Sequence, residues 1–85
     1  MNKNPRLYIN YGSGYQLEKA NTLDKIVNRL YSAFNEVGDT GYIQYIVIEV
    51  IDDGEFPTFI GSTREQVDEM AERIELGKKN NLKWR

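Results

Sequence analysis

The sequence of 85 residues contains no cysteine and no histidine. Without cysteine the chain forms no disulfide bond and offers no thiol nucleophile. Without histidine it lacks the side chain that most often acts as a general base near neutral pH. Catalysis would have to rest on carboxylates, lysines, tyrosines or a bound metal. We therefore expect a protein that is not an enzyme and that uses no cofactor and no metal.

Long apolar runs are missing as well. The longest, residues 45–48, is far shorter than the ~20 residues that a membrane-spanning helix requires. The first residues, M-N-K-N-P-R, lack the apolar segment of a secretory signal peptide. The content of 40% hydrophobic and 28% charged residues is that of an ordinary globular protein. We expect one soluble domain located in the cytoplasm.

Charge is distributed unevenly along the chain. All 13 acidic residues lie between Glu18 and Glu75, where only five basic residues oppose them, so this segment has a net charge of −8. The other six basic residues lie at the two ends, which brings the whole chain to −2. An acidic body repels a phosphate backbone. Nucleic acid is therefore not expected to lie across the domain.

The first half of the chain has the pattern of a hairpin followed by a helix. Alternating apolar residues over 6–18, interrupted by two glycines, predict two short strands. Apolar residues spaced three and four apart then predict a helix over 23–37. Either Asn21 or Thr22 suits the N-cap of this helix, and Gly38 suits its C-cap.

The second half repeats this layout. A run rich in β-branched and aromatic residues over 42–51 predicts a strand, and an Asp-Gly turn leads to a return strand over 56–60. Because Pro57 cannot donate a ladder hydrogen bond, the return strand is expected to lie at a sheet edge or to begin at this proline. Two overlapping capping boxes in S62-T63-R64-E65-Q66 start a second helix, which Gly77 is expected to end.

The element order ββαββα predicts an α+β fold over residues 1–77, followed by a basic tail over residues 78–85. The simplest packing is a two-layer sandwich, in which a four-stranded, mainly antiparallel sheet carries both helices on one face. A β-grasp-like arrangement, in which the sheet wraps the first helix, is the alternative.

The motif Y-G-S-G-Y at residues 11–15 raises the question of a phosphate-binding loop. Nucleotide-binding loops need G-x-G-x-x-G between a strand and a helix, or a final G-K-[ST], whereas here a strand follows the second glycine. Ser13 as a nucleophile would have no histidine base. We interpret the motif as a turn. A contact loop for a partner and a catalytic or phosphate-binding loop are the alternatives.

Acidic residues gather at the second hairpin and along the second helix. Their spacing does not match the calcium loop, and a wet hairpin tip does not drive two carboxyl pKa values apart. We interpret both groups as solvated surface; the alternatives are weak cation binding at the hairpin, docking of a basic protein, and mimicry of a nucleic-acid backbone by the helix. The residues are Glu49, Asp52, Asp53 and Glu55 on the hairpin and Glu65, Asp68, Glu69, Glu72 and Glu75 on the helix.

The third strand is apolar on both of its faces, so one apolar set is left outside if the helices cover a single face. The series Ile46, Ile48 and Val50 predicts the core side. The other set then lies beside Tyr8 on an open face, where a patch of tyrosine and branched side chains is typical of an interface. The alternative is an internal cover, supplied by a grasp-like sheet or by the tail with its single tryptophan. The predicted partner-binding residues are Tyr8, Ile43, Tyr45, Val47 and Ile51.

The sequence thus predicts a non-enzymatic protein–protein interaction module that binds a protein partner or, as a homodimer, a second copy of itself. No membrane partner is expected. The first alternative is a nucleic-acid-associated accessory protein that uses the basic ends, since bases around an aromatic side chain suit a single strand. The second alternative is an acidic inhibitor of a basic, DNA-binding protein.

Overall fold

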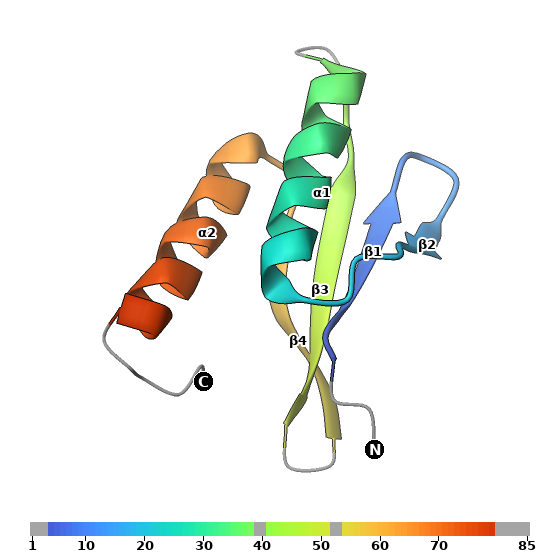
Figure 1. Cartoon of the computed structure of the whole chain (residues 1–85). Helices are drawn as coiled ribbons and strands as arrows, with labels where there is room; N and C mark the ends of the chain where they lie inside the picture. The colour runs from blue at the N-terminus through green and yellow to red at the C-terminus, as the bar shows by residue number, and fades with distance from the viewer. Residues whose placement is uncertain (1–3, 39–40, 52–53, 80–85) are drawn as a thin grey trace.

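The computed structural model describes residues 4–38, 41–51 and 54–79 of the chain (Figure 1). Six elements follow one another in the predicted order, which confirms the α+β class. They are β1 (Arg6–Asn10), β2 (Tyr15–Leu17), α1 (Leu23–Val37), β3 (Gln44–Ile51), β4 (Gly54–Gly61) and α2 (Arg64–Lys79). Asp52 and Asp53 of the predicted D-D-G-E turn, and the part of the predicted tail from residue 80 onward, lie outside the described residues.

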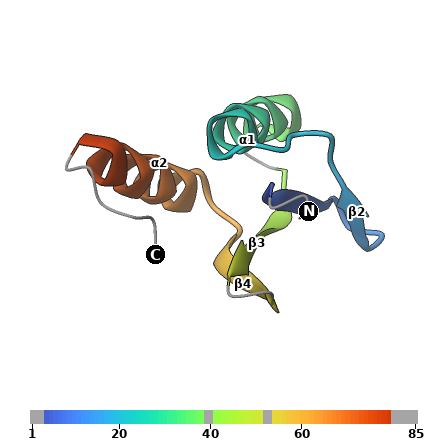
Figure 2. The same ribbon diagram turned by 60° about the horizontal axis from the view of Figure 1, so that its bottom comes forward.

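The four strands form one sheet in the order β2-β1-β3-β4, and every neighbouring pair is antiparallel. Both helices pack on the same face of this sheet (Figure 2). The structure is therefore the two-layer arrangement and not the grasp-like alternative. β4 is an edge strand, as its Pro57 predicts. The β3–β4 register shifts between Val47 and Ile48, which leaves Thr58 as the extra residue of a β-bulge.

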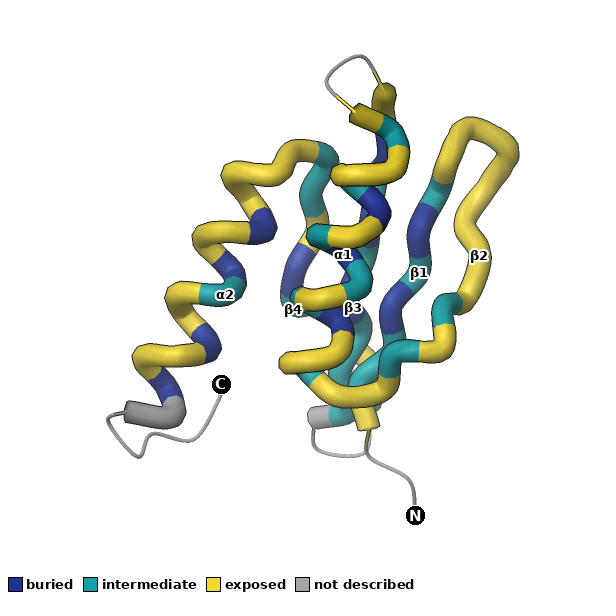
Figure 3. Tube along the Cα trace, turned by 45° about the horizontal axis from the view of Figure 1, so that its top comes forward, coloured by how far each residue is buried: buried dark blue, intermediate teal, exposed yellow. Residues whose placement is uncertain are grey.

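The hydrophobic core lies between the sheet and the two helices. Antiparallel register puts Leu7 of β1 opposite Val47 of β3, and it puts Ile9 opposite Tyr45, so these side chains share one face of the sheet. Burial alternates along both strands and recurs on one side of each helix (Figure 3). The core residues are Leu7, Ile9, Ile26, Leu30, Ala33, Ile43, Tyr45, Val47, Phe59, Val67, Met70 and Ile74.

The core uses the opposite face of β3 from the one that the sequence predicts. Placing Ile43, Tyr45 and Val47 on the open face is wrong, because all three are at most 1% exposed and belong to the core. Since β3 is apolar on both faces, its own pattern does not decide which side is covered. Strand β1 decides it: the register pairs its partly exposed Tyr8 with Ile46. The predicted core series of β3 therefore points away from the helices.

Local hydrogen bonds cap both helices. The hydroxyl of Thr22 accepts a bond from the backbone amide of Lys25 at 3.2 Å, and Gly38 ends α1 with a φ of 72°. At α2 the hydroxyl of Thr63 accepts from the amide of Gln66 at 3.2 Å. In return, Oε1 of Gln66 accepts from the amide of Thr63 at 3.1 Å. Of the two predicted capping boxes, the one that starts at Thr63 supplies this reciprocal pair.

Helix α2 is longer than the sequence predicts. It continues through Gly77, the predicted end, to Lys79. Glycine inside a helix costs about 1 kcal/mol relative to alanine, which is why the sequence places the end there. Here Gly77 is buried, so tertiary packing overrides that preference. Within the three described ranges, neither helix is long and apolar enough to cross a lipid bilayer.

Candidate protein-binding face

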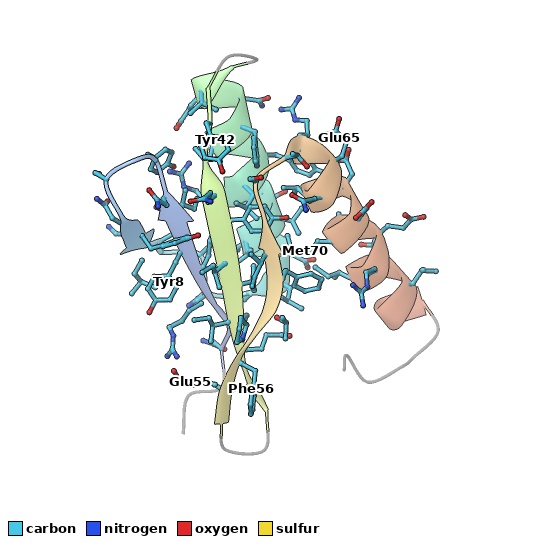
Figure 4. All side chains as sticks on the ribbon, turned by 180° about the vertical axis from the view of Figure 1, so that it is seen from behind. Tyr8, Tyr42, Glu55, Phe56, Glu65 and Met70 are labelled. Carbon is cyan, nitrogen blue, oxygen red and sulfur yellow. The ribbon has the colours of Figure 1, made fainter. Side chains whose placement is uncertain are left out.

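The face of the sheet that points away from the helices carries a row of apolar side chains. Strand register places Leu17 of β2 and Ile46 of β3 on either side of Tyr8 of β1. Ile60 of β4 in turn pairs with Ile46. These four residues, here called the apolar row, cross all four strands. Leu17 is 58% and Ile60 is 63% exposed, whereas the two between them are half-buried. Figure 4 views the sheet from this side, with Tyr8 labelled.

The apolar surface continues along β3. Ile48 and Val50 follow Ile46 at alternate positions and pair with Pro57 and Glu55 of β4. In the described part of the chain, the helices contribute their buried residues to the other side of the sheet. An antiparallel sheet with one solvated face normally carries polar residues there, and this face departs from that pattern. The apolar row together with Ile48 is called the open face below.

One ion pair bounds the open face at the start of β1. Arg6 lies opposite Ile48, and its Nη2 is 2.5 Å from Oε2 of Glu55 on β4. The hydrogen bond to Glu55 raises the pKa of the Arg6 guanidinium above its ordinary value. Among the described strand residues that register places on this side of the sheet, these two carry the charges. The charges of these described strand residues therefore cancel.

The opposite end of the face is bounded by amide side chains and by the turn at residues 11–15. Nδ2 of Asn10 donates to Oε1 of Gln44 at 3.5 Å. Oδ1 of Asn10 accepts bonds from the backbone amides of Gly12 at 2.7 Å and Gly14 at 3.1 Å. Both glycines have positive φ, 123° and 112°, which only glycine adopts readily. The predicted turn is confirmed, and these amides bind the protein's own side chain instead of forming a phosphate cradle.

Helix α1 holds this hairpin in place through Arg29. Its Nε donates to Oε1 of Glu18 at 2.9 Å, and its Nη2 donates to the hydroxyl of Tyr11 at 2.9 Å. The bond to Glu18 raises the pKa of Arg29, and burial raises the pKa of Tyr11. Because Glu18 directly follows Leu17, the contact fixes the end of β2 that supplies one member of the apolar row.

Within the described residues, the acidic side chains that the sequence singles out are spread over two faces of the sheet and along α2. Glu55 pairs with Val50, so Glu49, the neighbour of Val50 on β3, lies on the opposite face of the β3–β4 ribbon. Residues 52–53 lie outside the described part. Within that part, no three histidine, cysteine or acidic side chains are placed to hold a metal ion. The acidic residues of α2 lie exposed along the helix.

The five predicted partner-binding residues are divided by the structure. Tyr8 lies on the open face, Ile43, Tyr45 and Val47 lie in the core, and the side chain of Ile51 is outside the described part. That Tyr8 contacts a partner stays a prediction. The members of the open face that the sequence reasoning missed are Leu17, Ile46, Ile48 and Ile60. The alternation of buried and partly exposed positions in β1 would have identified Ile46 and Ile48 as members of the open face if the pairing of β1 with β3 had been known.

Comparison of the chain with known protein families, with curated proteins and with solved structures gave no match in any of the three. The geometry of the open face therefore carries the functional argument.

Proposed function

We propose that this protein acts by binding another protein through the open face. The observation that carries the proposal is the apolar row, which crosses β2, β1, β3 and β4 on the side away from the helices. A contiguous exposed apolar patch usually marks an interaction surface, and aromatic side chains are enriched at interface centres. A partner would remove the most surface from water at Leu17 and Ile60, the two exposed ends of the row.

The open face needs no rearrangement to bind. Its four strands are already joined to one another by ladder hydrogen bonds. The Arg6–Glu55 pair ties β1 to β4, and the contact between Arg29 and Glu18 ties the first hairpin to α1. Ordering of loops and side chains is one of the main costs of association. A preformed face avoids most of that cost.

Addition of a partner strand to a sheet edge is less well supported than binding to the face. The edge strand β4 contains Pro57, whose nitrogen cannot donate a hydrogen bond, and the bulge at Thr58. The other edge strand, β2, has only 3 residues. Proline, bulges and short edge strands are means by which proteins block unwanted strand addition. The face, and not the edge, is therefore the binding surface of the proposal.

The test compares two exposed apolar positions. The full chain, carrying an affinity tag, captures proteins from an extract of its native cells, and mass spectrometry identifies them. Ile60→Lys places a charge at one end of the apolar row. Leu76→Lys places the same charge on α2, where Leu76 is 50% exposed. We expect the wild type and Leu76→Lys to capture a common protein that Ile60→Lys does not.

Circular dichroism and the urea midpoint of each variant establish that the fold is intact before capture. A captured protein is then purified and titrated against all three chains. We expect Ile60→Lys to weaken its binding at least tenfold and Leu76→Lys to leave it unchanged. Equal binding by all three chains would contradict the proposal, because the open face would then take no part.

The two alternatives stay predictions. The basic ends lie mostly outside the described residues, and the acidic side chains of α2 form an exposed surface without a further feature that indicates a ligand. Binding to single-stranded nucleic acid that falls steeply with salt, and that disappears when residues 78–85 are deleted, would support the nucleic-acid alternative.

A further inference from the structure

We infer that the protein which covers the open face is a second copy of this chain, in a two-fold dimer whose sheets pack face to face. The inference rests on the proposed function, because it names the partner of the same face. Three properties of the described residues carry it: the charge of the face, the order of side chains along the apolar row, and the size of the sheet.

Charge favours a partner identical to the protein itself. The whole chain has a net charge of −2, and the acidic residues of α2 are exposed on the helix side of the molecule. Two copies that met through that side would bring like charges together, which costs free energy. Among the described strand residues on the open side the charges are Arg6 and Glu55, and they already pair with each other. Two copies that meet through this face therefore bring together strand charges that are already neutralised by each other, and not the like charges of α2.

The order of residues in the apolar row is self-complementary. Consider a two-fold axis that runs parallel to the strands, midway between the two packed sheets. Seen from above the sheet, this axis lies over the gap between β1 and β3. It places Tyr8 of one copy over Ile46 of the other, and Leu17 over Ile60, so that every member of the row meets an apolar side chain. Each contact occurs twice, as a two-fold interface requires.

The next row follows the same rule. Asn10 and Gln44 are paired residues of β1 and β3 at one end of the face. The same axis brings Asn10 of one copy over Gln44 of the other, where two amide side chains can exchange hydrogen bonds. Because the axis is parallel to the strands, the strands of the two copies run along the same line. This agrees with the aligned packing of two sheets, in which the mean strand directions differ by about 30° or less.

The size of the face also fits a second copy. Four strands about 4.8 Å apart, with eight residues of about 3.4 Å each in β3, span at most about 19 by 27 Å, or about 500 Å² in projection. A stable interface buries about 800 Å² of accessible surface on each partner, and side-chain relief makes accessible area larger than projected area. A partner must therefore cover the whole face to bury an accessible area close to about 800 Å² on this protein. A second sheet of equal size covers it, whereas one added peptide strand would not.

Light scattering and sedimentation of the purified full chain test the inference over a range of protein concentration. We expect a mass of two chains for the wild type and for Leu76→Lys, and a shift to one chain for Ile60→Lys at the same concentration. A mass of one chain for the folded wild type at the highest concentration reached would overturn the inference. The proposed function would then be decided separately, by whether Ile60→Lys loses a different captured protein.

The absence of cysteine makes the geometry testable without background. Facing sheets lie about 10 Å apart, which is too far for a direct disulfide. Leu17→Cys and Ile60→Cys chains are therefore mixed and treated with a short bifunctional thiol cross-linker, and each is treated alone. The two-fold axis places position 17 of one copy over position 60 of the other, while equal positions are in addition offset sideways by three strand spacings, or about 14 Å. We expect the mixture to form far more cross-linked dimer than either chain alone. Equal cross-linking by a single variant on its own would overturn this arrangement.

Discussion

The ring of Tyr45 lies directly against the backbone of Gly61. The two residues pair across β3 and β4, and a Cβ atom at position 61 would lie 2.6 Å from the hydroxyl oxygen and 2.8 Å from Cζ of the ring. Tyr45 is only 1% exposed, so its ring has little room to move away. The close approach of β4 to this buried tyrosine therefore depends on glycine at position 61.

Gly61→Ala is expected to lower the free energy of unfolding by about 1–3 kcal/mol, because the added methyl group overpacks the site. Urea unfolding measures the change. In a Tyr45→Leu chain the hydroxyl and the ring carbon are gone. The remaining close atom, Oε1 of Gln66 at 2.8 Å, is the end of an exposed side chain, so the same substitution should cost less there. If Gly61→Ala costs the same in both backgrounds, the contact with the ring is not what limits this position.

Alkaline pH should destabilise the protein through Tyr45. Burial, with a smaller contribution from the charge of Glu69, raises the pKa of Tyr45 to about 12 from an ordinary value of 10.0. The folded state therefore favours the protonated phenol. Its contribution to stability is complete below pH 10 and is lost as the pH rises toward 12. At about 1.4 kcal/mol per pKa unit, we expect a fall in the free energy of unfolding of up to about 3 kcal/mol over this range.

Urea unfolding at several pH values in this range tests the prediction. Tyr45→Phe should make the fall clearly smaller, since the phenol that titrates is gone. The same substitution at the exposed Tyr15 serves as the control for the loss of one tyrosine hydroxyl from the chain. An equal fall in the wild type and in Tyr45→Phe would show that other groups cause it.

Arg29 should hold the first hairpin against α1. Arg29→Met removes the bonds to Glu18 and Tyr11, and we expect a loss of about 1 kcal/mol because the site is only partly buried. Hydrogen exchange should become faster at the amides of β2. Lys25→Met, at an exposed position of the same helix, is the control. Unchanged exchange in β2 of the Arg29 variant would contradict this role.

Asn10 should define the turn at residues 11–15. Asn10→Ala removes the acceptor of the Gly12 and Gly14 amides, and we expect faster exchange of both amides and a loss of about 1 kcal/mol. Asn10→Asp keeps an acceptor oxygen and loses only the bond to Gln44, so it should retain most of the protection. Identical behaviour of the two variants would show that the side chain does not order the turn.

Helix α1 and the first hairpin were predictable because their signals are local. The helix has one apolar stripe and is bounded by Thr22 and Gly38, and both caps are observed. The glycines at positions 12 and 14 mark the turn, which needs their positive φ. The end of α2 was less predictable, because the burial of Gly77 depends on residues distant in sequence.

The open face could be predicted as a feature but not by its members. Strand β3 is apolar on both sides, and this pattern predicts that one apolar set lies away from the helices. Which set it is depends on the register between β1 and β3, a contact across more than thirty positions of the chain that pairs Tyr8 with Ile46. Ile60 joins the row only through the bulge at Thr58, which shifts the register of β4. Neither fact has a local signal.

The most direct test of the central claim records the methyl signals of Leu17, Ile46 and Ile60 by NMR while an unlabelled partner is added. The partner is a captured protein; for a second copy of the chain, the same signals are instead followed while the labelled chain is diluted until it dissociates. We expect these signals to shift or broaden, while those of the core residue Leu30 and of the exposed Leu76 on α2 stay in place. Binding that moves the signal of Leu76 and leaves the open face unchanged would contradict the account.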